Sequence, residues 1–148
     1  MKQSSRRKFI TQTGMTLAGF PFITRNWLQS PPSDRIRVGH VGVNGMGKSH
    51  LRWFAAMKDV ETVALCDVDS RHLADAEKIR TSMQPGIKAE GHEDYRRIID
   101  RKDIDVVTCA TPDHWHALVA IHAFESGKDV YGEKPLSYSV KEGQAMLA

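Results

Sequence analysis

Residues 36–47 read IRVGHVGVNGMG, a largely apolar run followed by the glycine-rich loop Gly42–Gly47. The apolar run predicts a buried β-strand that spans Ile36–Val43. The residues after the loop, Ser49–Met57, have a helical pattern. Glycines in such a loop allow a tight turn and let the backbone come close to a ligand. The N–H groups at the start of a helix attract negative charge. The stretch therefore predicts a strand, a loop and a helix that can hold an anionic group such as a pyrophosphate.

Downstream of this stretch, short β-rich segments alternate with helical patterns. The alternation is typical of an α/β fold with a doubly wound parallel sheet, the Rossmann fold. A full sheet of this kind has six strands in the order 3-2-1-4-5-6, so we expect a domain truncated before the sixth strand and before a second, α+β domain. The predicted strands are Ile36–Val43, Thr62–Asp67, a weaker one near Ile87–Gly91, Asp105–Ala110 and Asp129–Gly132.

Local signals mark the ends of several helices. Thr111 followed by Pro112 predicts an N-cap and a first-turn proline, and Gly127 predicts the end of the same helix. Ser139 with Glu142 predicts a capping box for a last helix. One more helix is indicated by residues at helical spacing, all apolar except the arginine: Leu73, Ala76, Arg80 and Met83.

The composition is that of a globular protein, with 148 residues of which 41% are apolar and 26% charged. The formal net charge of +3 is unevenly distributed. Residues 1–34 contain five basic residues and one acidic residue, whereas the rest of the chain contains 16 basic and 17 acidic residues. The basic excess belongs to the N-terminal segment, which argues against nucleic acid as a partner.

The N-terminal segment, residues 1–34, resembles a twin-arginine export signal followed by a linker. The stretch Ser5–Ile10 reads SRRKFI, and the weakly apolar stretch Gly14–Ile23 follows it. This apolar stretch is shorter than the about 20 residues of a membrane-spanning helix, so we expect membrane contact only through the export signal. We expect export of the folded protein to the periplasm or cell envelope; the alternative is a basic tail without signal function. The folded domain then covers residues 35–148.

Two cysteines, Cys66 and Cys109, lie in predicted strands that flank a common neighbour. Two strand spacings separate such residues by about 9 to 10 Å, which is beyond the reach of a disulfide. The sequence therefore predicts two buried free thiols.

An acidic residue, Asp67, ends the second predicted strand, 20 residues after Gly47. A carboxylate at this position accepts hydrogen bonds from the adenosine ribose hydroxyls, and its charge repels a 2′-phosphate. The sequence therefore favours NAD over NADP, although Arg71 would soften the preference. The loop departs from G-x-G-x-x-G at Asn44, and Gly45 is expected to provide the close approach instead. Methyltransferases that bind S-adenosylmethionine use a similar loop and acid, so this pair alone predicts a nucleotide-like ligand.

The segment Thr111–His116 reads TPDHWH and follows the fourth predicted strand. The loops after the first and fourth strands form the two sides of the ligand cleft in this topology, so we expect contact with the cofactor or its neighbour. A metal site at His114 and His116 is disfavoured, because residues two apart on a helix face different ways. Asp113 and His116 are three apart, but no third ligand is evident. No metal is predicted.

The segment Glu133–Pro135 follows the fifth predicted strand, beside the fourth. A lysine at this edge of the sheet would be partly desolvated, which suits it to exchange a proton with a substrate hydroxyl. Pro135 would fix the turn that directs it. Lys134 is therefore the candidate catalytic residue.

Together these motifs resemble the glucose-fructose oxidoreductase / inositol dehydrogenase (Gfo/Idh/MocA) family over residues 35–148. The resemblance is carried by Gly42–Gly47, Asp67, Asp105–His116 and Gly127–Pro135. The chain departs from the family pattern at Asn44, where glycine is usual, and at Asp113 and Asp129, where asparagine and histidine are frequent.

The resemblance implies a role for each candidate residue. Lys134 helps to handle the proton of the substrate hydroxyl, and Glu133 lies near the nicotinamide and the substrate. The peptide bond before Pro135 is often cis in such proteins. The residues expected to bind the cofactor are Gly42, Asn44, Gly45, Met46 and Gly47 in the loop, Asp67 at the adenosine ribose, Thr111, Pro112 and His116 along the cofactor, and Glu133.

The function that follows is that of an exported, NAD-dependent oxidoreductase acting on a sugar, cyclitol or polyol. Two alternatives stay open: a glycosidase that oxidises and re-reduces the same sugar on NAD, and a nucleotide-binding module without chemistry. The family's usual aspartate and histidine pair on a second domain is absent from this sequence, so we expect this segment alone to be inactive. We expect the full-length protein to be a homo-oligomer.

Overall fold

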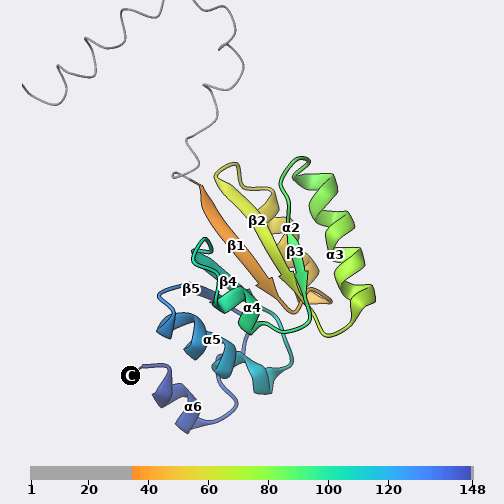
Figure 1. Ribbon diagram of the computed structural model, residues 1–148. Coiled ribbons are helices and arrows are strands. Elements are labelled where there is room, and N and C mark those ends of the chain that lie inside the picture. The colour runs from red at the N-terminus through yellow and green to blue at the C-terminus, as the bar shows by residue number, and fades with distance from the viewer. Residues whose placement is uncertain (1–34, 148) are drawn as a thin grey trace, which may run out of the picture. The chain divides into compact units, whose positions relative to one another are not determined.

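The computed structural model describes residues 35–147, which form a five-stranded parallel sheet with the order β3-β2-β1-β4-β5 (Figure 1). The strands are β1 (Ile36–Val41), β2 (Val60–Cys66), β3 (Glu90–His92), β4 (Val106–Cys109) and β5 (Asp129–Gly132). Each neighbouring pair of strands is parallel. This order confirms the doubly wound Rossmann fold predicted from the sequence. The predicted export signal and linker lie outside the described residues.

Helices cover both faces of the sheet, as Figure 1 shows. They are α2 (Met46–Ala55), α3 (Ser70–Met83), α4 (Arg96–Ile99), α5 (His116–Glu125) and α6 (Val140–Ala145), with the 3₁₀ turn η2 (Asp113–Trp115) before α5. An apolar cluster that includes Leu51 and Ala76 joins α2 and α3 to the sheet. A second cluster, which includes Ile98 and Val119, joins α4 and α5 to the sheet. Within residues 35–147, none of the helices has the length and apolar character needed to cross a membrane.

The limits of several strands differ from those predicted. β1 ends at Val41 rather than Val43, because Gly42 has a φ of 77° and turns the chain out of the extended conformation. β2 begins two residues earlier than predicted, at Val60, where its pairing with β1 begins. The weak third strand is short and covers only Glu90–His92.

Two of the three predicted helix ends are confirmed. Ser139 and Glu142 form the capping box at the start of α6, and Gly127 has a φ of 73° just past the end of α5. The predicted N-cap at Thr111 is wrong. Pro112 has a ψ of 148°, which is extended backbone, so the chain first makes the η2 turn and α5 begins at His116.

Arg80, the exception in the apolar stripe of α3, is buried. Its guanidinium donates hydrogen bonds to the carbonyl oxygens of Gln84 and Ile87 and pairs with Glu77. A buried charge is tolerated when it is paired and hydrogen-bonded in this way. The arginine therefore holds the turn after α3 from a position where an apolar residue was expected.

Cys66 and Cys109 are both buried and free, as predicted. They end β2 and β4, and both strands pair with β1. Burial raises the pKa of Cys66 to about 12 and also raises the pKa of Cys109. Both side chains therefore act as small apolar groups of the core.

Candidate functional site

The carboxyl ends of the parallel strands bring the four predicted segments to one edge of the sheet. The glycine loop follows β1, Asp67 follows β2, Thr111–His116 follows β4 and Glu133–Pro135 follows β5. Hydrogen bonds also join each of these segments to its neighbour along the edge. This edge of a doubly wound sheet is where ligands bind.

The glycine loop leaves the start of α2 open. A Cβ on Gly47 would lie 1.9 Å from the carbonyl oxygen of Gly42, so the turn requires glycine there. Gly45 has a φ of 49°, and the space where a side chain would stand is open. In the described residues, only glycines have a positive φ. Gly45 is thus the open N-cap of α2, and its close approach to a pyrophosphate stays a prediction. No side chain caps α2, and its first turn, from Met46, has no acidic residue; an anion can bind there.

Asp67 is held by backbone groups of two segments. Its Oδ2 accepts the Val43 N–H at 3.1 Å, and its Oδ1 accepts the Asp69 N–H at 3.0 Å and lies 3.1 Å from Nδ1 of His72. A carboxylate oxygen accepts two hydrogen bonds, so Oδ2 keeps a lone pair for a ribose hydroxyl. Arg71 forms an ion pair with Asp69 at 2.6 Å, so its charge is already compensated. The acid that favours NAD is therefore fixed in place.

His72 connects the acid to the glycine loop. Its Nε2 lies 3.1 Å from Nδ2 of Asn44, and its Nδ1 faces the Asp67 carboxylate. A carboxylate only accepts, so Nδ1 carries the proton and Nε2 accepts from the asparagine amide. Asn44, at the position where the family usually has glycine, thus has His72 as its hydrogen-bond partner in this chain.

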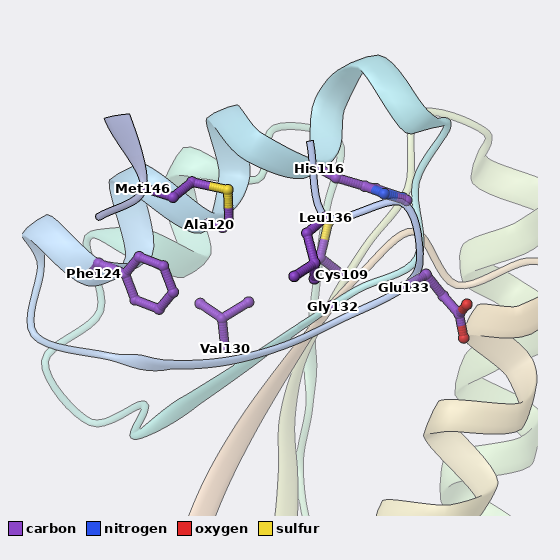
Figure 2. Close-up of a pocket in the computed structure, with 9 residues that line it drawn as sticks. All are labelled: Cys109, His116, Ala120, Phe124, Val130, Gly132, Glu133, Leu136 and Met146. Atoms are coloured by element: carbon purple, nitrogen blue, oxygen red, sulfur yellow. The ribbon is translucent and has the colours of Figure 1, made fainter. Parts of the chain in front are cut away.

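Glu133 is bound to the helix that follows the glycine loop. Its Oε1 lies 2.9 Å from Nε2 of His50, and its Oε2 accepts the Lys134 N–H at 3.3 Å. His50 is fully buried, its Nδ1 has no hydrogen-bond partner among the described residues, and its Nε2–H donates to the Glu133 carboxylate. The hydrogen bond from His50 lowers the pKa of Glu133. Figure 2 shows the Glu133 carboxylate directed toward α2, away from the apolar side chains of the neighbouring cavity.

The segment after β4 is tied to the segment after β5 by His116. The ring Nδ1 lies 2.7 Å from the carbonyl oxygen of Pro135, and Nε2 lies 2.8 Å from that of Thr111. Both ring nitrogens thus face protein carbonyls, and the position of the ring along the cofactor stays a prediction. His114 is exposed, and no cluster of three or more potential metal-binding side chains exists within residues 35–147.

Lys134 is exposed, so the partial desolvation expected from the sequence is not present in this chain. Among residues 35–147, its side chain makes no hydrogen bond and no ion pair, while its neighbours Glu133 and Pro135 are both held. The peptide bond between Lys134 and Pro135 is cis, as the resemblance implied. The amine is therefore free to meet a ligand at the edge of the sheet.

Two residues of the site, His50 and His72, were not identified from the sequence. His50 lies three residues after Gly47, on the same buried face of α2. A polar side chain on a buried helix face needs a hydrogen-bond partner, and this signal in the sequence could have identified His50. His72 gave no local signal, because its partner Asn44 lies 28 residues away in the chain.

Three comparisons place the chain among known proteins. The family model described as "Oxidoreductase family, NAD-binding Rossmann fold" matches residues 36–148. A glycosyl hydrolase family 109 protein of Shewanella sp. (strain W3-18-1) is 37% identical over 135 residues, which are 88% of this chain and 28% of that protein. Myo-inositol 2-dehydrogenase from Lactobacillus plantarum has a TM-score of 0.67 and 27% identity, covering 76% of this chain and 32% of its own. Levoglucosan dehydrogenase in complex with NADH and L-sorbose has a TM-score of 0.65 and 34% identity, covering 76% of this chain and 30% of its own.

The chain spans less than a third of each of these proteins. Its own geometry fits NAD: the open start of α2 suits the pyrophosphate, and the fixed carboxylate of Asp67 suits the adenosine ribose. The matched residues include every candidate segment of the site. The chain therefore belongs to the Gfo/Idh/MocA oxidoreductase family, and residues 36–148 form its NAD-binding Rossmann domain.

Proposed function

We propose that this chain is the NAD-binding part of an oxidoreductase that transfers hydride between nicotinamide and a sugar, cyclitol or related polyol. The observation that carries the proposal is the placement of Lys134, whose free amine lies between two anchored neighbours at the edge that also holds the glycine loop. The inositol and levoglucosan dehydrogenases among the similar structures support this substrate class.

Different residues of the chain bind different parts of the cofactor and the substrate. The start of α2, with Gly45 before it, binds the pyrophosphate, and Asp67 binds the adenosine ribose. NAD supplies the acceptor for the hydride that leaves the substrate carbon. Lys134 hydrogen-bonds the substrate hydroxyl and helps to pass to solvent the proton that this hydroxyl loses as the carbon becomes a carbonyl. In the reverse direction the same amine returns the proton.

A second candidate function is glycoside hydrolysis with transient oxidation of the sugar. The 37% identical Shewanella relative, a glycosyl hydrolase family 109 protein, favours it. The same binding site serves both reactions, because hydride taken from a sugar carbon in an early step is given back in a late step. Only the net result differs: NAD is unchanged and a glycosidic bond is cleaved.

The two functions are separated by assaying the intact protein, isolated with its cofactor, on two substrate panels. Free sugars and cyclitols with added NAD should yield NADH and an oxidised product if the protein is a dehydrogenase. Nitrophenyl glycosides should instead release nitrophenol without net NADH if it is a glycosidase. Activity on neither panel, together with tight NAD binding, would contradict both and favour a nucleotide-binding module.

We also propose that the intact protein is exported through the twin-arginine pathway. The paired arginines Arg6 and Arg7, followed by a short apolar stretch, support this. Because NAD is scarce outside the cytoplasm, the cofactor would leave with the folded protein and be regenerated on it. Cell fractionation tests the proposal: the protein should appear in the periplasm or envelope, and replacing both arginines by lysine should retain it in the cytoplasm.

A further inference from the structure

His116 occupies a position where three elements of the site meet. It is the first residue of α5, it is 3% exposed, and its ring lies between the segments that follow β4 and β5. Nδ1 is 2.7 Å from the carbonyl oxygen of Pro135, and Nε2 is 2.8 Å from that of Thr111. One side chain therefore joins the segment after β4 to the segment after β5.

The chemistry of the two contacts determines how many protons the ring carries. Carbonyl oxygens only accept hydrogen bonds, and a neutral imidazole has a single N–H. With a neutral ring, one of the two contacts would set a nitrogen lone pair against an oxygen lone pair at hydrogen-bonding distance. The ring that satisfies both contacts is the imidazolium, which donates from each nitrogen.

The surroundings of the ring are compatible with a positive charge. The cavity beside it is lined by apolar side chains from α5, from β5 and from the segments that follow β5 and α6, and its other ionisable lining residues are Cys109 and Glu133 (Figure 2). Burial raises the pKa of Cys109, so that thiol is neutral, while the hydrogen bond from His50 lowers the pKa of Glu133, so that carboxyl is an anion. The one charged group among these other lining residues is therefore an anion, whose carboxylate is directed toward His50 rather than into the cavity.

The contacts of His116 help to fix the backbone on one side of Lys134, and those of Glu133 fix it on the other. The Glu133 N–H donates to the carbonyl oxygen of Cys109 at 2.9 Å, and its carboxylate is held by His50. On the other side of Lys134, the carbonyl of Pro135 is held by His116. The backbone of Lys134 is thus fixed at both ends, while its amine is left to the ligand.

We propose that His116 is a positioning residue for Lys134: a doubly protonated clasp that joins the loop after β4 to the Glu133–Pro135 segment and sets where the lysine amine meets the substrate. The inference rests on the proposed function for the role of Lys134, but not for the proton count of the ring.

The proton count is tested on the intact, unmutated protein labelled with ¹⁵N-histidine. Long-range ¹H–¹⁵N spectra at neutral pH should show two protonated ring nitrogens for His116, assigned by the signals that disappear in His116→Gln. One protonated and one unprotonated ring nitrogen would contradict the doubly protonated state proposed for His116. The spectrum needs no turnover, so it decides the inference even if the intact protein proves inactive on sugars.

The positioning role is tested by kinetics. His116→Phe keeps the ring and removes both donors, and it should lower kcat about ten- to a hundredfold with the Kd of NAD unchanged, because a small displacement of a reacting group is costly. His116→Gln, whose amide retains N–H donors, should recover part of the loss. The matched control is His122→Phe on the same helix, which removes a hydrogen bond to Tyr95 and should leave kcat unchanged. Wild-type kcat in His116→Phe, or an equal loss in the control, would overturn the role.

Discussion

His50 and Glu133 are 83 residues apart in the chain, yet Nε2 of the histidine lies 2.9 Å from Oε1 of the carboxylate. The bond joins the helix that starts at the cofactor loop to the segment that carries Lys134. Because His50 is fully buried and also packs its ring against Tyr131 at 5.0 Å between centroids, its position is fixed by the core. The helix that follows the glycine loop and the segment that carries Lys134 are therefore joined directly.

Replacing His50 by phenylalanine should uncouple the two ends. The variant keeps the aromatic packing but leaves Glu133 without its donor, so we expect kcat to fall about tenfold or more as the lysine segment moves. Steady-state kinetics measures this. In a double-variant cycle, adding Glu133→Gln should cause little further loss, because the two residues act through one bond. Fully additive losses would contradict the coupling.

His40 should make the stability of the protein fall in mild acid. It is buried in the sheet between the hydroxyls of Thr108, at 2.8 Å, and Thr62, at 3.2 Å, and burial lowers its pKa to about 3 from 6.5. Between these values the unfolded chain binds a proton that the folded chain does not. Stability is therefore full above about pH 6.5 and is lost as the pH falls toward about 3, by about 1.4 kcal/mol per pH unit at most for one group.

Melting midpoints of the intact protein across this pH range test the effect of His40. The variant His40→Gln cannot titrate, so its midpoint should fall less steeply with decreasing pH than that of the unmutated protein. His122→Gln, at a half-buried histidine outside the sheet, is the control and should keep the wild-type slope. Parallel slopes in all three proteins would show that His40 carries no such penalty.

The two cysteines should be inert in the folded protein. Burial raises the pKa of both thiols, that of Cys66 to about 12, so almost no reactive thiolate is present at about pH 8. Alkylation followed by peptide mapping should find both residues unmodified before unfolding and both modified afterwards. Recovery of a peptide that contains Cys66 linked to Cys109 would contradict the strand arrangement.

Asp67 should govern the choice between NAD and NADP. In Asp67→Asn the charge that repels a 2′-phosphate and strengthens the ribose hydrogen bond is lost, so we expect about tenfold weaker NAD binding and a gain in NADP binding relative to NAD. Titration calorimetry with both cofactors measures the ratio. The control is Asp59→Asn, at an exposed acid just before β2 and so at the opposite edge of the sheet, which should change neither value. An unchanged ratio in Asp67→Asn would show that another group selects the cofactor.

The fold was predictable because its signals are local and repeated. The glycine loop, the acid at Asp67 and the alternation of strands and helices led to the strand order that the structure shows. The ends of elements were less predictable, because they depend on single dihedral angles. Gly42 ends β1 early through a positive φ, and the extended Pro112 delays α5 until His116.

The site was predictable at the level of segments but not of partners. The sequence placed Lys134 and its neighbours at the correct edge of the sheet, since parallel strands end on the same side. It gave no sign that Glu133 would be held by His50 or that His116 would face two carbonyls, because each contact links residues brought together only by the folded chain. The exposure of Lys134 was also not foreseen.

The most direct test of the account is the turnover of the intact protein when Lys134 is replaced by alanine. If the amine handles the substrate proton, kcat should fall by about 100-fold or more while the Kd of NAD stays at its wild-type value. Lys141→Ala, at an exposed lysine of α6, serves as the control and should retain full activity. Wild-type turnover in Lys134→Ala, with the cofactor bound as before, would contradict the central claim that this segment carries the chemistry.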